Sequence, residues 1–365
     1  MGETSIEWTD VTWNPVRGCS RVSPGCGGAR GEGGCYAERL AARFSGPGLP
    51  YEGLARRSEK RGLPQWTGVV RLVPEHLADP LRWKRPRRVF VNSMSDLFHE
   101  GLSNETIAAV FGVMAAAPQH TFQILTKRAK RMREWFEWAR DFALQQRDIA
   151  CAPNTARTML NAAAEYLGTK HDGLNAAWRR LENDSWPLSN VHLGVSCENQ
   201  PTADERVPFL LATPAAARFV SAEPLLGPIR FHVLDLFGRD MPLGGIDQII
   251  VGGESGPGAR PCDLAWIRSI LAQCKAAGVP AFCKQLGARP YEYAASLRGG
   301  YDPRDLTEAM GRAHPPQMDG WTRVVTDATE GYYRYPRFLN RKGGDPSEWP
   351  ADLRIREFPT TRGAP

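Results

Sequence analysis

Three cysteines lie close together near the start of the sequence, in a loop rich in glycine. Cys19, Cys26 and Cys35 are separated by six and eight residues, and no histidine falls between them. In a reducing compartment, clustered thiols are more often metal ligands than disulfide partners. Zinc usually takes four ligands, whereas three thiolates alone suit a [4Fe–4S] cluster whose remaining iron is open to a small ligand. The spacing therefore predicts an iron–sulfur site; structural zinc with a distant fourth ligand and unliganded cysteines are the alternatives.

A second set of candidates follows the apolar runs of the chain, which mostly end in a carboxylate, a lysine or a small polar residue. In parallel α/β folds the carboxyl ends of the strands meet at one edge, where function collects. We therefore expect these residues to converge around one mouth, although for any one of them alone a capping or loop role is the better interpretation. The candidates for catalysis are Glu223, Glu254 and Lys284. The candidates for cofactor binding are Asn92, Ser93, Asp96, Ser196, Glu198, Gly252 and Gly253.

Two basic runs carry much of the net charge of +6, at residues 83–88 (WKRPRR) and 127–133 (KRAKRMR). Such runs suit a polyanion such as nucleic acid, and we expect both to flank the mouth. A solvated surface with no partner is the alternative. The side chains expected to bind nucleic acid, DNA more than RNA, are Arg85, Arg87, Arg88, Lys127, Arg128, Lys130 and Arg131.

The elements that must position these residues are eight β-type runs that alternate with helical stretches. The runs begin at Trp8, Val69, Val89, Thr121, Val191, Arg218, Gln248 and Pro280. Near-continuous apolar strands are typical of a sheet buried on both faces, and strand–helix alternation implies parallel crossovers. The predicted fold class is α/β, a (β/α)8 TIM-type barrel that is complete or partly open. A doubly wound open sheet is the alternative, but no G-x-G-x-x-G follows the first run.

Two segments fall outside this repeat. Residues 137–187 have apolar residues at helical spacing and predict a helical insertion in a barrel of residues 1–290 that carries the cysteine loop at 19–35. Residues 291–365 are irregular and rich in Gly, Pro and Tyr, which predicts an extension that wraps the barrel. No apolar run approaches a membrane span, and the first ten residues lack a signal peptide's apolar core, so we expect a cytoplasmic protein.

Many stretches are similar to one known family. The chain resembles the phage-associated three-cysteine-motif family, a radical-SAM-like and largely uncharacterised group, in TSIEWTDVTWNPVRGC, CYAERLAARF, VFVNSMSDLFHE, FQILTKR, LGVSCENQ, RFVSAEPLLGPI and IIVGGESGPGARP. The resemblance covers most of residues 4–288 and implies a radical-SAM-like barrel with a [4Fe–4S] cluster on the three cysteines. In radical SAM enzymes the open iron binds S-adenosylmethionine, and electron transfer cleaves it to a 5′-deoxyadenosyl radical.

The chain departs from the radical SAM pattern in two places. Those enzymes usually have three and two residues between the cysteines, and the spacer GGARGEGG here is an insertion relative to the resembled family as well. Their Gly-Gly-Glu commonly ends the second strand, whereas the Gly-Gly-Glu of this chain, residues 252–254, comes five strands later. S-adenosylmethionine as the ligand of the cluster therefore stays open.

These patterns together predict an iron–sulfur enzyme that modifies or repairs nucleic acid by radical or single-electron chemistry, with an electron donor as partner. Repair of a pyrimidine dimer is one candidate reaction. One alternative is a non-catalytic nucleic-acid-binding protein with structural zinc. Another is a non-redox barrel enzyme in which Glu223, Glu254 and Lys284 do acid–base work.

Overall fold

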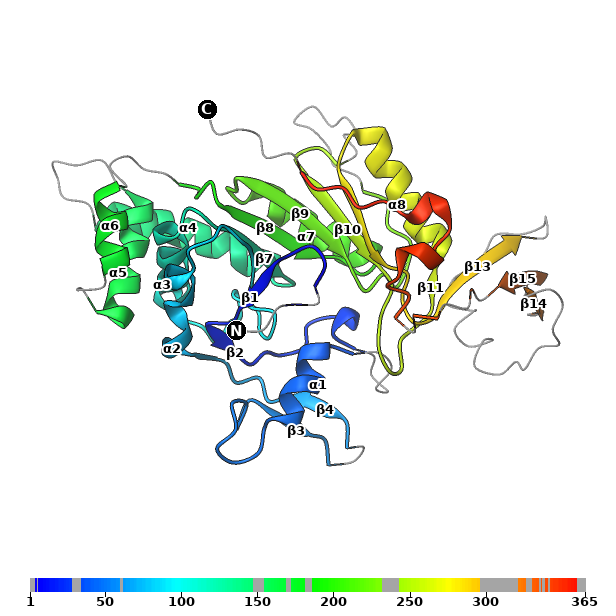
Figure 1. Cartoon of the computed structure of the whole chain (residues 1–365), viewed down its shortest axis with the longest axis horizontal. Helices are drawn as coiled ribbons and strands as arrows, with labels where there is room; N and C mark the ends of the chain where they lie inside the picture. Colours follow the sequence, from blue (N-terminus) through cyan, green and yellow to red (C-terminus); the bar gives the residue numbers. More distant parts are fainter. Residues whose placement is uncertain are drawn as a thin grey trace.

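The structure is a computed structural model that describes residues 4, 6–27, 34–59, 62–146, 154–168, 172–180, 186–231, 243–295, 321–325, 330–334, 336, 339–340 and 342–359. Its centre is a seven-stranded sheet in which every pair of neighbours is parallel. In order across the sheet, the strands are β1 (Val11–Trp13), β6 (Arg88–Val91), β7 (Thr121–Thr126), β8 (Val191–Ser196), β9 (Ala217–Ala222), β10 (Gln248–Gly252) and β12 (Ala281–Gln285). The sheet curls into a half-barrel with helices around it (Figure 1). The predicted α/β class and a partly open barrel are confirmed.

Helices connect the parallel strands. Among them are α3 (Asn104–Ala116), α4 (Ala129–Gln145), α7 (Gln200–Ala212) and α8 (Leu264–Ala277). Ser103, Asn199 and Asp263 each cap the start of a helix by accepting a hydrogen bond from a backbone amide two or three residues later. Such caps satisfy amides that the helix itself leaves free. Among the described helices, none is both long and apolar enough to cross a membrane.

One predicted strand does not join the sheet. The run at residues 69–73 contributes only β5 (Arg71–Leu72), which pairs antiparallel with β2 (Val16–Arg17) in a separate two-stranded sheet. The prediction of an eighth barrel strand is wrong because Val69 is 53% exposed and α2 (Pro74–Leu77) begins almost directly afterwards. The run is therefore neither buried on both faces nor long enough to cross the sheet.

Two helices fall within the segment predicted as an insertion, α5 (Thr155–Leu167) and α6 (Asp172–Arg180), while α4 occupies the start of that segment. Helices α5 and α3 pack side by side (Figure 1). Gly112 of α3 lets the two backbones touch, since a Cβ there would lie 2.1 Å from the carbonyl oxygen of Met159.

The cysteine loop belongs to a small lobe beside β1. The lobe contains η1 (Pro24–Cys26), α1 (Tyr36–Arg43), β3 (Ala55–Arg57) and β4 (Pro64–Trp66). Its apolar centre includes Ala41, Trp66 and Met94, against which Cys19 and Cys35 pack. The loop is thus attached to a core separate from that of the main sheet.

The described end of the chain returns to the sheet. In this part of the chain, β13 (Pro290–Ala295), β14 (Trp321–Val325) and β15 (Glu330–Arg334) form a second sheet with β11 (Cys262–Asp263), and the short helices η3 (Pro346–Glu348) and η4 (Ala351–Leu353) follow. The short helix η2 (Asp79–Arg82) lies elsewhere, between α2 and β6. The amide of Cys283 in β12 donates to the carbonyl of Ile355, and the amide of Glu357 donates to the carbonyl of Ala281, both at 2.8 Å. Residues 354–358, which we call the edge strap, therefore cover the free edge of β12. Residues 296–320 and 360–365 of the predicted extension lie outside the described residues.

Candidate functional site

A cavity of about 590 Å³ opens at the carboxyl-terminal edge of the curled sheet. Most of the residues predicted to converge at this edge do so. Of the ten candidates for catalysis or cofactor binding, seven line the cavity: Asn92, Ser93, Asp96, Ser196, Glu223, Glu254 and Lys284. Glu198, Gly252 and Gly253 do not line it.

The polar wall rests on an apolar floor because side chains alternate along each strand. Phe90, Phe219 and Phe282 pack with Trp8 and Ile250 in one cluster on the concave side of the sheet. Residues two positions further along their strands face the same side, one layer nearer the carboxyl edge. Across β6 to β12 that layer comprises Asn92, Lys127, Ser196, Ser221, Gly252 and Lys284.

The cysteine loop forms another wall of the cavity, as its position after the first strand predicts. Cys19, Cys26 and Cys35 all line the cavity, and all three are free and half-buried. The amide of Cys35 donates to the carbonyl of Cys26 at 3.3 Å. The other described cysteines are buried and do not line the cavity: Cys197, Cys262, Cys274 and Cys283.

The three thiols lie within electrostatic range of one another. Burial raises the pKa of Cys19 to about 12; the charge of Asp96 adds to this shift and that of Arg128 opposes it. Burial also raises the pKa of Cys35, and each of these thiols is further affected by Cys26. Within the described part of the chain, no three His, Cys, Asp or Glu side chains form a group that could hold a metal ion. A metal would therefore have to draw the thiols together and displace their protons.

Glu198, a candidate for cofactor binding, contacts the cysteine loop and not the cavity. Its Oε1 accepts a hydrogen bond from the amide of Gly25 at 3.0 Å, and its Oε2 lies 3.0 Å from Nη1 of Arg206. Burial alone would raise the pKa of this carboxyl group, but the positive charges of Arg206 and Lys127 outweigh burial, and the pKa is lowered. Glu198 is thus a charged, fully buried anchor for the loop.

Glu254 makes the matching contact on the other side of the loop. Its Oε1 accepts from the amide of Gly34 at 3.0 Å, and the guanidinium of Arg260 bonds both carboxylate oxygens at 2.8 Å. Arg260 also donates to the carbonyl of Pro24 at 2.7 Å. Burial would raise the pKa of Glu254, but the hydrogen bonds from Arg260 and Gly34 outweigh it and lower the pKa. We call the Glu198–Gly25 and Glu254–Gly34 contacts the loop clasps.

Glu223 and Lys284, both candidates for catalysis, form an ion pair at the cavity wall. Nζ of Lys284 lies 2.7 and 2.9 Å from the two carboxylate oxygens, and Nε2 of Gln285 donates to Oε1 at 2.9 Å. All three residues line the cavity. A ligand can therefore reach the pair, although each charge already has its counter-charge.

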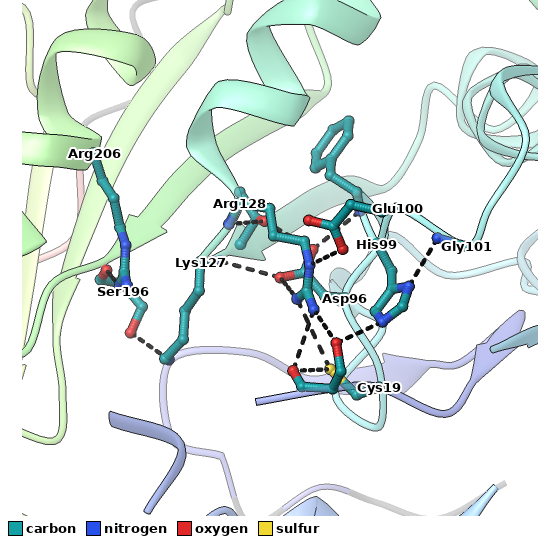
Figure 2. A network of polar contacts seen from close by, with 12 residues as sticks. Cys19, Asp96, His99, Glu100, Gly101, Lys127, Arg128, Ser196 and Arg206 are labelled. Atoms are coloured by element: carbon teal, nitrogen blue, oxygen red, sulfur yellow. Dashed lines mark hydrogen bonds and ion pairs between the residues drawn. The ribbon is translucent and has the colours of Figure 1, made fainter. Parts of the chain in front are cut away.

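Lys127 and Arg128 are neighbours in sequence but point to different places (Figure 2). Nζ of Lys127 donates to Oγ of Ser196 at 2.7 Å. Arg128 lies behind Cys19, with Nη1 4.0 Å from its Sγ, and is held by Asp96 at 3.2 Å. Asp96 thus supports the cysteine loop through Arg128, whereas Lys127 faces the cavity.

Ser20 and His99, beside Cys19, have the residue types of a nucleophile and a base. Nε2 of His99 lies 2.9 Å from Oγ of Ser20, but Nδ1 accepts a hydrogen bond from the amide of Gly101 at 3.0 Å (Figure 2). Burial and the charge of Arg128 lower the pKa of His99, so the neutral ring carries its proton on Nε2 and donates it to Ser20. The pair therefore lacks the free base that nucleophilic catalysis requires.

The first basic run does not flank the cavity. Because residues 83–88 lead into β6, Arg85, Arg87 and Arg88 lie at the amino-terminal edge of the sheet, opposite the cavity. Arg88 is paired there with Asp10 at 3.1 Å. The expectation for this run is wrong, because basic composition does not indicate on which side of a strand a run will fall.

The second basic run reaches the cavity only at its start. Lys127 and Arg128 line the cavity, whereas Lys130 and Arg131 belong to α4 and do not. Nζ of Lys130 lies 3.9 Å from a glutamate one turn along the helix. Arg131 donates to a side-chain amide oxygen at the start of α3.

The remaining candidates contact neighbouring segments of the chain. Asn92 and Ser93 hydrogen-bond to the segment that follows β1. A Cβ at Gly252 or Gly253 would lie 3.0 or 2.4 Å from a carbonyl oxygen of the chain at the end of β12. These two glycines are therefore needed for close approach of the chain, whatever binds in the cavity.

Sequence reasoning missed the arginines that complete the clasps. Arg260 lies in the motif GGESGPGARP, where a basic residue six positions after Glu254 was a usable signal. Arg206 and Arg39 lie on helices with no such local pattern, and Arg39 donates to the carbonyl of Gly34 at 3.1 Å. Ser221 ends one of the apolar runs expected to converge at the mouth, and its place two residues after Phe219 puts it on the concave side.

Comparison with known proteins adds one finding. A family model described as a protein of unknown function (DUF5131) matches residues 3–324. No curated protein and no solved structure matches the chain.

Proposed function

The chain belongs to the DUF5131 family, whose description assigns no function, and from its site we propose that it is an iron–sulfur enzyme acting on nucleic acid by single-electron chemistry. The proposed cluster is a [4Fe–4S] cluster held by Cys19, Cys26 and Cys35. The observation that carries this proposal is that these three thiols, and none of the other described cysteines, line the same cavity.

The donor set fits such a cluster better than a single zinc ion. A single zinc ion usually takes four ligands in one tetrahedron, and the residues that line this cavity include three thiols and no histidine. A four-iron cluster separates its ligating sulfur atoms more widely. With three thiolates, one iron would remain open toward the cavity, and the cluster would supply one-electron transfer.

The contacts that Glu254 already makes affect which carboxylate could bind the ammonium group of S-adenosylmethionine. The resemblance to radical SAM enzymes suggests that the open iron binds this molecule and that a Gly-Gly-Glu receives its ammonium group. Here Glu254 is already bonded by Arg260 and by the amide of Gly34. If S-adenosylmethionine binds, we therefore expect Glu223 to be the carboxylate nearest its ammonium group, since it lines the cavity at the end of β9.

Nucleic acid is the proposed substrate class because of the size and charge of the cavity. About 590 Å³ is within the range of small-molecule sites and of the pockets that receive bases turned out of a strand. Lys127, Lys284 and Lys342 line it. Repair of a pyrimidine dimer is the concrete reaction that we propose to assay.

Metal analysis tests the cluster directly. Anaerobically purified protein should contain about four irons and four sulfides, with visible absorption and an EPR signal after reduction. A Cys19/Cys26/Cys35→Ala triple variant should lose them, whereas Cys274→Ala, which removes a buried cysteine of α8, should keep them. One zinc and no visible absorption would overturn the proposal and favour a nucleic-acid-binding protein. Addition of S-adenosylmethionine to the reduced protein should change the EPR signal if it binds the open iron.

The Glu223–Lys284 ion pair supports a second candidate, a non-redox enzyme that uses this pair for acid–base chemistry. In that case Glu223→Gln would abolish turnover of the substrate while the Cys→Ala variants kept it. The iron–sulfur proposal expects the reverse order of effects, because the cysteines would hold the redox group.

A further inference from the structure

The cavity carries more positive charge than its own carboxylates neutralise. Four carboxylates line it, and each has a cationic partner: Glu7 with Arg356, Asp96 with Arg128, Glu223 with Lys284, and Glu254 with Arg260. Two lining ammonium groups, those of Lys127 and Lys342, have no carboxylate within ion-pair distance in the part of the chain that the structure describes. An anionic ligand would complete this balance most strongly at Lys127, because Lys127 is half-buried whereas Lys342 is exposed to solvent.

Two serines stand beside Lys127 on the concave side of the sheet. Ser196 and Ser221 are register partners on β8 and β9, so their side chains lie next to each other. Nζ of Lys127 is 2.7 Å from Oγ of Ser196, which uses one of the three donors of the ammonium group. Ser221 is only 2% exposed and lines the cavity, yet among the described residues its hydroxyl has no hydrogen-bond partner.

We propose that Lys127, Ser196 and Ser221 form a phosphate-binding subsite that receives a phosphoryl group of the substrate. A lysine ammonium binds phosphate as a point charge, and the Ser221 hydroxyl is a donor beside it. The Ser196 hydroxyl donates to the carbonyl of Glu223 at 3.2 Å and accepts from Lys127, so Ser196 holds the ammonium group in place. The half-buried position of Lys127 strengthens the attraction, because the local dielectric constant is below that of water. The subsite rests on the proposed function for the identity of the substrate, a nucleotide, but phosphate binding itself needs no cluster.

Binding to metal-free, full-length protein tests the subsite. Inorganic phosphate, thymidine 5′-monophosphate, thymidine and acetate are titrated at constant ionic strength, with calorimetry for the ligands and ³¹P NMR for the phosphates. We expect phosphate and the monophosphate to bind, and Lys127→Met to weaken both by about tenfold or more through loss of a charged donor. Ser221→Ala should weaken them a few-fold. Lys130→Met is the matched control, since this lysine lies on α4 outside the cavity, and it should bind as the unaltered protein does.

Three outcomes would overturn the subsite. If Lys127→Met and Lys130→Met weaken phosphate binding equally, the attraction is a general effect of charge. If acetate binds in a way that depends on Lys127 and phosphate does not bind, the site is one for carboxylates. Monophosphate affinity equal to that of thymidine would show that the phosphoryl group makes no contact. If Lys127→Met does not fold by circular dichroism, Ser221→Ala carries the test. Iron and sulfide are measured on separate, anaerobically purified samples. Absence of both from those samples would reject the cluster, while phosphate binding by the metal-free protein would keep the subsite.

Discussion

At the scale of single residues, the carboxylates that follow the strands have two different roles. The role of each depends on whether its cationic partner is an arginine or a lysine. Glu198 and Glu254 are paired with Arg206 and Arg260 and hold glycine amides of the cysteine loop. Glu223 has a lysine partner and lines the cavity. A guanidinium can bond a carboxylate and a loop carbonyl at once, as Arg260 does, which suits it to holding a loop in place.

The clasp at Glu198 should be required for stability. Glu198→Gln leaves Arg206 buried without its counter-charge, so we expect the free energy of unfolding to fall by about 3 kcal/mol, measured by urea denaturation at neutral pH. Glu205→Gln is the matched control: that carboxylate is 67% exposed and lies 4.0 Å from the same arginine, so its change should stay within about 0.5 kcal/mol. Equal losses in the two variants would contradict the clasp.

The same carboxylate should make stability depend on pH. In the folded protein the pKa of Glu198 lies below its ordinary value of 4.5. Its contribution is therefore fully present above pH 4.5 and is lost as the pH falls through the folded value, because the unfolded chain binds the proton more readily. Urea titrations from about pH 6 to pH 3 should show a shallower loss of stability in Glu198→Gln than in the unaltered protein. Parallel curves would show that another carboxylate is responsible.

Alkylation of metal-free protein should reveal the raised pKa of Cys19. Since burial and the charge of Asp96 raise that pKa to about 12, the thiolate fraction should increase about tenfold per pH unit throughout the range from pH 7 to pH 9. Mass spectrometry of iodoacetamide-treated protein measures the rate at each cysteine. A plateau of the Cys19 rate near pH 9 would contradict the buried, protonated thiol.

The sequence predicts that these residues meet at one edge of the sheet. It does not predict which hydrogen bonds and ion pairs they form there. Parallel strands must end at one edge, so the positions of Glu223 and Glu254 follow from the order of the apolar runs. The amide that each carboxylate binds comes from a loop whose path is not periodic, and Gly34 is 220 residues away from Glu254. Such contacts depend on the folded backbone and leave no local pattern.

At the scale of the elements, burial decided which apolar runs became barrel strands. β7, β8 and β10 came from runs that are buried on both faces, at most or all of their positions. The run that became β5 is as apolar in composition, but its exposed valine and early proline limit it to a two-residue antiparallel pair. The sequence could have indicated this through the proline, since strands of a central sheet rarely end so abruptly.

The contact between α3 and α5 should be sensitive to one methyl group. Gly112→Ala would place a Cβ 2.1 Å from the carbonyl oxygen of Met159, so one helix must shift. We expect a loss of about 2 kcal/mol in the free energy of unfolding, despite the better helix propensity of alanine. Gly46→Ala, whose Cβ would meet only a leucine methyl group at 3.5 Å, is the matched control. Unchanged stability in Gly112→Ala would show that α5 does not lie against α3 in solution.

At the scale of the whole molecule, both ends of the chain close the open side of the half-barrel. Glu7, just before β1, is paired with Arg356 of the edge strap at 2.8 Å. Arg356 also donates to the carbonyl of Lys284 at 3.3 Å, and Arg88 lies over the ring of Phe358 at 4.5 Å. The gap between the first and last strands is thus bridged by side chains, which replaces the eighth strand that a closed barrel would have.

Removal of the edge strap should make the protein self-associate. A chain that ends after residue 353 exposes the amide and carbonyl groups of β12 that now bond to Ile355 and Glu357, and an unpaired, flat strand edge is a template for intermolecular pairing. We expect larger species by size-exclusion chromatography with light scattering. A chain that ends after Pro359 keeps the strap and should elute as the full chain does, so it separates loss of the strap from loss of length. If both truncated chains elute alike, the side chains of the helices and loops around β12 protect this edge without the strap.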